Sequence, residues 1–166
     1  ECRIEQLSTS TSATLDDGCT FENGTVTQHR DVYMVNQKQL GLPDRSGANM
    51  LTFTASAEFG GNFAIGQMGG EIFPSPVYGS TSFAANAPKS FSLIGSKSVY
   101  KFWIGGQSAA DLGDYTVTTS VSPSTDICES GKLVFIQGDV SFSSDISGAT
   151  SCQGTIEFGP NAGGPL

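Results

Sequence analysis

The stretch from Ser98 to Val121 constrains the fold of this chain more than any other. It opens with the almost wholly apolar run Val99 to Ile104, which two glycines close, and after a polar loop Tyr115 to Val121 alternates apolar with Ser and Thr side chains. An apolar run bounded by glycine and a period-two alternation are both typical of β-strands. We therefore predict a β-hairpin whose first strand is central and buries the only tryptophan, Trp103.

The segment from Met50 to Phe59 has the cleanest alternation in the chain, with apolar side chains at every second position and Thr, Ser or Glu between them. This pattern predicts a half-buried strand of an antiparallel sheet. Charged residues make up 14% of the 166 residues, against a typical value of about 25%, and 21 residues are glycine. Such a composition fits many short strands joined by turns, so we predict an all-β, antiparallel fold.

The Ser-Pro-Ser segment at residues 122–124 is the best candidate for a domain boundary. We predict a β-sandwich over residues 1–123 and a short β extension over residues 124–166. Each part contains two cysteines that bracket a Ser-rich segment and precede a short strand and a glycine turn. We interpret the extension as the start of a second, incomplete copy of the first unit, and chance similarity in a Ser-rich background is the alternative.

The four cysteines fall into two pairs that are close in sequence, which predicts the disulfides Cys2–Cys19 and Cys128–Cys152. A zinc site is the competing interpretation, but the CxxC spacing is absent and the chain has one histidine. Disulfides persist in oxidising compartments. We therefore expect a secreted chain that is extracellular or attached to a cell surface, and its start at Glu1 fits a processed form.

The net charge of −8 argues against nucleic acid as a partner, because the phosphate backbone attracts basic proteins. The chain also lacks an apolar run of the roughly 20 residues that cross a bilayer, so we expect no membrane insertion. Asn23 begins the sequon Asn-Gly-Thr, which is a candidate N-glycosylation site. A tight Asn-Gly turn is the competing interpretation of this site.

Five features together resemble the bacterial pre-peptidase C-terminal domain. They are Cys2, the turn Leu15–Cys19, the strand Asp31–Tyr33, the strand Met50–Phe59 and the segment Gly113–Thr119. The resemblance covers roughly the first 122 residues and is a pattern of strands and turns. It implies a β-sandwich with jelly-roll-like topology, of the kind attached to proteases and other exported proteins.

Some members of that family bind calcium through acidic residues near the start of the domain and a D-x-D-x-Y strand. The resemblance transfers this role to Asp16, Asp17 and Asp31, with calcium as the one expected cofactor. In this chain His29 stands where the first acid of the strand motif is expected, which weakens the match. Turn-capping carboxylates at the end of a solvated strand are the alternative.

The sequence contains no recognisable catalytic constellation. A Ser-His-Asp site requires His29, the only histidine, and no serine lies in a G-x-S-x-G motif. Asp111 and Asp114 are close enough in sequence to be proposed as a glycosidase pair, but such pairs are much more often turn residues. We therefore predict that the chain is not an enzyme.

Two main non-catalytic roles remain, and a third, a virion or cell-surface coat subunit, shares the assembly logic of the first. In the first, the strands after residue 123 pair with an identical neighbouring molecule, and the chain is a structural subunit of a self-assembling extracellular filament or surface layer. In the second, the chain is an accessory module of a secreted enzyme and binds a polysaccharide or a protein. Phe73 and Tyr78 lie in a Pro-rich segment and are the candidate surface aromatics for stacking on a sugar.

Overall fold

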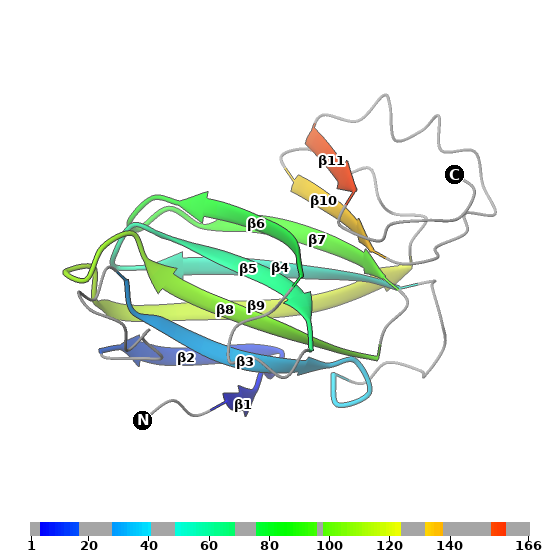
Figure 1. Cartoon of the computed structure of the whole chain (residues 1–166), viewed down its shortest axis with the longest axis horizontal. Helices are drawn as coiled ribbons and strands as arrows, with labels where there is room; N and C mark the ends of the chain where they lie inside the picture. Colours follow the sequence, from blue (N-terminus) through cyan, green and yellow to red (C-terminus); the bar gives the residue numbers. More distant parts are fainter. Residues whose placement is uncertain are drawn as a thin grey trace.

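The computed structural model describes residues 4–16, 28–40, 49–68, 76–95, 98–123, 132–137 and 154–158, and every regular element in these residues is a β-strand (Figure 1). The strands are β1 (Ile4–Gln6), β2 (Ser10–Leu15), β3 (Arg30–Asn36), β4 (Asn49–Ala57), β5 (Gly61–Gln67), β6 (Val77–Phe83), β7 (Lys89–Gly95), β8 (Val99–Gly106), β9 (Gly113–Pro123), β10 (Lys132–Gln137) and β11 (Gly154–Phe158). They form a first sheet with the order β1-β3-β8-β5-β6 and a second sheet with the order β11-β10-β7-β4-β9-β2.

Strands β2 to β9 form a jelly roll. Four of them, β3-β8-β5-β6, lie in the first sheet and the other four, β7-β4-β9-β2, lie in the second, and neighbours within each set are antiparallel. Every successive strand from β2 to β9 passes from one sheet to the other except at the β5–β6 connection. This is the double-sheet arrangement of jelly rolls. The prediction of an all-β sandwich with jelly-roll-like topology is confirmed, and its strands β2 to β9 are antiparallel as expected. Both sheets are nevertheless mixed, because β1 pairs in parallel with β3 and β10 pairs in parallel with β7.

The predicted hairpin over residues 98–121 is wrong. β8 lies between β3 and β5 in the first sheet, whereas β9 lies between β4 and β2 in the second. The chain therefore crosses the sandwich after Gly106, and the two strands face each other across the core. A hairpin within one sheet and a crossing between two sheets give the same sequence pattern, namely an apolar run, a turn and an alternating strand. The pattern therefore does not determine which strand pairs with β8. The predicted central position of β8 is confirmed.

Aromatic rings from both sheets make the core. The rings of Phe53 in β4 and Phe102 in β8 are stacked with their centres 5.3 Å apart, and those of Phe63 in β5 and Phe91 in β7 are stacked at 4.7 Å. All four side chains are fully buried. The apolar positions predicted for Met50 to Phe59 also face this core. Burial of these rings is the main force that holds the two sheets together.

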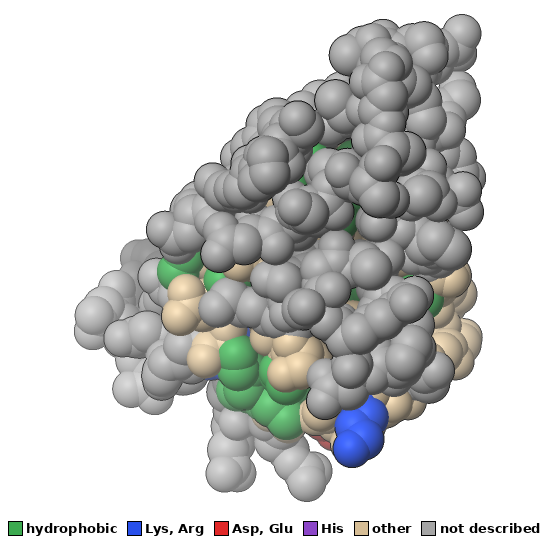
Figure 2. All heavy atoms as spheres, turned by 90° about the vertical axis from the view of Figure 1, so that its right-hand side faces the viewer, with side chains coloured by type: hydrophobic (Ala, Val, Ile, Leu, Met, Phe, Trp, Pro, Cys, Tyr) green, Lys and Arg blue, Asp and Glu red, His purple; other side chains and the backbone are tan. Residues whose placement is uncertain are grey.

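The two ends of the sandwich differ in character. Acidic side chains gather where β4 and β8 end and β3 and β9 begin, and they belong to Asp31, Glu58, Asp111 and Asp114. At the opposite end, where β5 finishes, Met68 and Val77 are exposed hydrophobic residues. Figure 2 views the molecule from the right-hand side of Figure 1 and shows hydrophobic side chains among polar ones on that face.

The C-terminal strands extend the second sheet of the jelly roll. β10 pairs in parallel with β7, and β11 pairs in parallel with β10. The ring of Phe135 enters the main core opposite Gly79 of β6, and the hydroxyl of Tyr100 donates a buried hydrogen bond of 3.1 Å to Oε1 of Gln137. The predicted short β extension is thus present. The expectation that its strands pair only with another molecule is wrong for β10, because β7 and β11 of the same chain are its partners.

A glycine-to-alanine change at position 79 is expected to destabilise the protein by about 1–3 kcal/mol, because the added Cβ overpacks the core. That Cβ would lie 2.3 Å from ring atoms of Phe135. Gly60→Ala is the matched control, since its Cβ meets no atom closer than 3.8 Å. Urea unfolding followed by circular dichroism measures both changes. Equal stability of the two variants would show that Phe135 does not occupy this space.

Candidate binding face

The outer face of the second sheet is covered with hydroxyl groups. β2, β9, β4 and β7 alternate, and the side chains that point away from the core are almost all Ser or Thr. We call the exposed and partly exposed members of this set the hydroxyl face: Ser10, Ser12, Thr14, Thr54, Ser56, Ser90, Thr116, Thr118 and Ser120. Thr52 and Ser92 continue the pattern but are buried.

The strand register arranges these hydroxyls in rows across the sheet. Ser12, Thr116 and Ser56 lie side by side in one row on β2, β9 and β4. Hydroxyl groups of adjacent strands are hydrogen-bonded, at 3.2 Å between Ser12 and Thr116 and at 2.7 Å between Thr54 and Ser90. Neighbouring strands lie about 4.8 Å apart and alternate residues along one strand about 6.7 Å apart, so the hydroxyls form a two-dimensional array.

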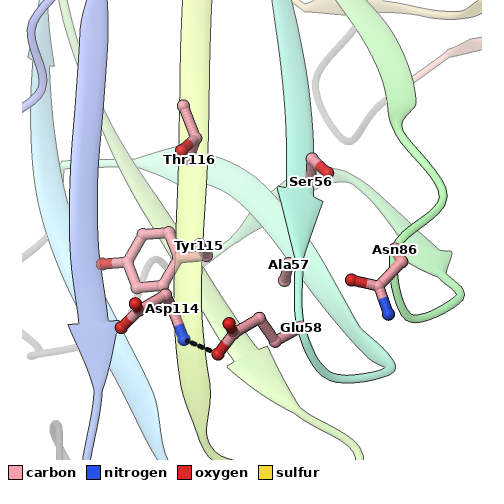
Figure 3. A pocket seen from close by; sticks show the side chains of 7 residues that line it. All are labelled: Ser56, Ala57, Glu58, Asn86, Asp114, Tyr115 and Thr116. Atoms are coloured by element: carbon pink, nitrogen blue, oxygen red, sulfur yellow. Dashed lines mark hydrogen bonds between the residues drawn. The ribbon is translucent and has the colours of Figure 1, made fainter.

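The hydroxyl face ends in a surface hollow at the acidic end of the sandwich (Figure 3). Its lining consists of Ser56, Ala57, Glu58, Asn86, Asp114, Tyr115 and Thr116. Backbone hydrogen bonds hold the segments that line the hollow together. The backbone amide of Glu58 donates to the carbonyl of Asp114 at 2.9 Å. The amide of Asn86 donates to the carbonyl of Ala57 at 2.7 Å, and Asn86 occupies the left-handed turn conformation with φ of 58°. Figure 3 shows the side chain of Glu58 beside Asp114 and that of Asn86 on the other side of Ala57.

Both carboxylates of the hollow already accept hydrogen bonds from the protein. Oε2 of Glu58 accepts from the backbone amide of Asp114 at 3.0 Å, and Oδ1 of Asp114 accepts from the hydroxyl of Thr14. Asp111, in the loop before β9, accepts a hydrogen bond from the backbone amide of Ser108 at 2.8 Å and another from the Ser108 hydroxyl at 3.0 Å, and these bonds close a turn. The interpretation of Asp111 as a turn residue is therefore confirmed, and Asp114 serves a cross-strand contact.

The lining of the hollow and the hydroxyl face share one chemical character. Hydroxyl, amide and carboxylate groups donate and accept hydrogen bonds, and the named lining includes no Lys or Arg side chain. The one aromatic residue in it, Tyr115, is 2% exposed. Such a surface can bind a polar ligand by many hydrogen bonds, and it offers no ring for stacking.

A buried hydrogen-bond network connects the two sheets behind this hollow. The hydroxyl of Tyr115 in β9 donates to Oδ2 of Asp31 in β3 at 2.7 Å, and the hydroxyl of Tyr33 donates to that of Tyr115. Burial is the main cause that raises the pKa of both phenols, and the negative charge of Asp31 raises both further. The network keeps both phenols neutral and fixes the spacing of the sheets at this end.

The three candidate calcium ligands lie in different surroundings or outside the described residues. Asp31 is the acceptor of the tyrosine network, and Asp16 is exposed directly after β2 at the same end of the sandwich. Asp17 lies outside the described residues. Among the residues that the structure does describe, no three His, Cys, Asp or Glu side chains form a group that could hold a metal ion. Calcium binding stays a prediction from the family resemblance.

One of the two candidate stacking aromatics is corrected by the structure. Tyr78 is 4% exposed, and its ring packs edge-on against Tyr100 with the centres 6.0 Å apart. It belongs to the core because β6 turns it between the sheets, so its ring is not on the surface. Phe83 and Tyr100 are buried in the same core.

The remaining predicted sites lie outside the described residues. They are Phe73, the sequon at Asn23, and the four cysteines Cys2, Cys19, Cys128 and Cys152. The disulfides and the glycosylation therefore stay predictions. In the part of the chain that is described, no helix has the length and apolar character needed to span a membrane.

Trp103 is buried, as expected, although its side chain points away from the main core. It lies on the outer face of the first sheet in a small cluster with Val32 and Ala64, and it is 7% exposed. The guanidinium carbon of Arg30 lies 4.1 Å from the centre of the indole ring. Gly105 allows this contact, since a Cβ there would lie 2.8 Å from Cγ of Arg30. Burial lowers the pKa of Arg30.

Arg30 is also tied to polar neighbours on this face. Its Nε and Nη2 atoms donate to Oε1 of Gln28 at 3.0 and 2.6 Å. The side-chain Nε2 of Gln28 in turn donates to Oδ1 of Asn62 at 2.8 Å. The indole is therefore held under a fixed guanidinium. This arrangement favours a structural role for Trp103 over a role in stacking on a ligand.

No family model matches the chain, and no curated protein matches its sequence. Several solved structures are similar to it, among them the following three. The pre-peptidase C-terminal domain of a collagenase from Bacillus anthracis is 13% identical, with 71% of this chain and 95% of that chain covered and a TM-score of 0.46. A CBM4 structure is 16% identical, with coverage of 69% and 70% and a TM-score of 0.38. The coat protein of Tobacco streak virus is 19% identical, with coverage of 70% and 88% and a TM-score of 0.35. These similarities concern the path of the backbone.

Raising the pH is expected to unfold the protein together with the ionisation of its buried phenols. Tyr33, Tyr78 and Tyr115 all have a pKa above the ordinary value of 10.0. The folded state therefore holds these protons more tightly than the unfolded state does, and the free energy of unfolding falls as the pH rises above about 10. Phenolate absorbance and circular dichroism, recorded on one sample, should change together. Ionisation of all four tyrosines in a folded chain would contradict the network.

Replacing Arg30 with Ala should uncover one face of the indole and shift the fluorescence of Trp103 to longer wavelength. The loss of the cation–π contact is expected to cost about 0.5–1 kcal/mol of stability. Because the chain has one tryptophan, its emission reports this site alone. Lys38→Ala, a change of an exposed residue after β3, is the control and should leave the emission unchanged.

Proposed function

We propose that this chain is a non-catalytic, extracellular accessory module that binds a neutral polysaccharide along its hydroxyl face. The observation that carries the proposal is the array of nine exposed or partly exposed hydroxyls, which runs across four strands and ends in the hollow between Glu58 and Asn86.

The chemistry of the array complements a glycan. Each hydroxyl can donate one hydrogen bond and accept others, as each sugar hydroxyl does, so the two surfaces can pair in many registers. A single such bond contributes about 0.5–1.5 kcal/mol net, so useful affinity requires several of them at once. A polymer that lies along the sheet satisfies this condition, whereas a single sugar does not.

The charge of the hollow selects against anionic glycans. Glu58 and Asp114 bring two carboxylates to one end of the face, and the whole chain has a net charge of −8. A polymer that carries sulfate or uronate groups would be repelled from this end. We therefore expect the preferred partner to be a neutral polymer of β- or α-linked hexoses.

The filament hypothesis loses its main support in the described residues. It rested on strands after residue 123 that find hydrogen-bonding partners only in another molecule. β10 finds such partners in β7 and β11, and Phe135 and Ile136 are buried within the chain. The module hypothesis does not depend on a partner copy, so it accounts for this arrangement directly.

Binding to insoluble neutral polysaccharides, measured by depletion from solution, tests the proposal. The double variant Ser12→Ala/Ser56→Ala removes two hydroxyls from one row, and at about 1 kcal/mol for each hydrogen bond the affinity should fall roughly 30-fold. The matched control is Ser80→Ala/Ser82→Ala, which makes the same changes at exposed positions of β6 in the first sheet. The control should bind as the native chain does. Equal loss in both variants, or no binding by the native chain to any neutral polymer, would overturn the proposal.

A further inference from the structure

β10 lies in a groove where it pairs with an edge strand of the jelly roll. The groove lies between β6, at the edge of the first sheet, and β7, which is the edge of the jelly roll in the second sheet. β10 adds to β7 with Leu133 opposite Phe91 and Gln137 opposite Gly95. Figure 1 shows β10 and β11 beside the β7 end of the sandwich. The backbone of β7 supplies the hydrogen bonds, as in other cases of strand addition to a sheet edge.

Three alternate residues of β10 face the inside of the sandwich, and each has a place there. Leu133 packs against the core, the ring of Phe135 fills the space over Gly79, and Gln137 accepts the buried hydrogen bond from Tyr100. Phe135 also meets the ring of Phe91 edge-on, with the centres 5.1 Å apart. Backbone pairing together with pockets for alternate side chains is how an added strand gains both affinity and specificity.

The strand is seated far from the strand that precedes it in the chain. β7 and β4 lie between β10 and β9 in the second sheet, and β10 makes its main contacts with β6, β7 and β11. None of the contacts of Phe135 and Gln137 named above involves β9. The same contacts would therefore form, unchanged, if β10 came from a second copy of this chain.

We propose that β10 is an exchangeable strand, and that the groove between β6 and β7 accepts the β10 of a second copy to give a strand-swapped dimer. Exchange replaces each contact with an identical one, so the balance is set by concentration. The chain's own β10 competes at an effective concentration of about 1 mM, so exchange occurs when chains fold together at comparable concentration. A swapped dimer presents two hydroxyl faces, but the inference stands independently of what those faces bind.

A pair of complementary full-length variants tests the exchange. Gly79→Ala blocks the groove but keeps an intact β10, and Phe135→Ala keeps the groove but weakens β10. In a mixed dimer, native β10 enters the native groove, while the shortened side chain of the Phe135→Ala strand leaves room for the Cβ added at position 79. The two chains, with different tags, are refolded together at about 1 mM and analysed by native mass spectrometry. We expect mixed dimers to exceed dimers of either single variant by about tenfold or more, because only mixed dimers relieve both defects.

The controls separate exchange from other association. Gly60→Ala replaces Gly79→Ala in a parallel mixture, and since it leaves the groove open it should give no enrichment of mixed dimers. If Gly79→Ala alone does not fold, its recovery in soluble form by co-refolding with Phe135→Ala is the same positive result. Monomers only, or mixed dimers at the statistical proportion in both mixtures, would overturn the proposal.

Discussion

Contact between aromatic rings across the two sheets is the constraint on which the rest of the structure depends. Phe53 stacks on Phe102 and Phe63 stacks on Phe91, so each pair joins one strand of each sheet. The rings fix which face of every strand points inward, because side chains alternate along a strand. Once the inward faces are set, the outward faces follow. The hydroxyl face of the second sheet and the Trp103 face of the first are therefore consequences of the same packing.

Prediction from the sequence succeeded for properties of a single strand, such as which of its faces is buried. It failed for properties that depend on other strands, such as which strands pair. The alternation of Met50 to Phe59 predicted its buried side correctly, since burial of one face is a property of that strand. The hairpin prediction for β8 and β9 failed because pairing depends on other strands. The burial of Trp103 was predicted correctly, but its face was not, because β8 is covered on both faces and register places the indole beside Val32 and Ala64 on the outer face.

The hydroxyl face is a second feature that the sequence predicts only in part. The polar positions between Leu51 and Phe59 were evident in the sequence as the solvent side of one strand. Their arrangement into rows with Ser12 and Thr116 depends on the register of β2, β9 and β4. That register is defined by contacts between residues that are roughly 60 to 100 positions apart in the sequence. A search for Ser and Thr at every second position in several segments would have found the components. It would not have shown that they share one surface.

The glycine at position 79 makes room for Phe135 of β10 beside the eight strands of the jelly roll. A side chain at that point of β6 would overlap the ring of Phe135 and so weaken the packing of β10 against the jelly roll. Because Gly79 has no side chain, the ring of Phe135 fits between the sheets at this point. Gln137 then accepts a hydrogen bond from the hydroxyl of Tyr100. One missing Cβ therefore links an edge strand of the first sheet to a strand much later in the chain. Because this space fits the side chain rather than the connection to it, the geometry is indifferent to which copy of the chain supplies β10.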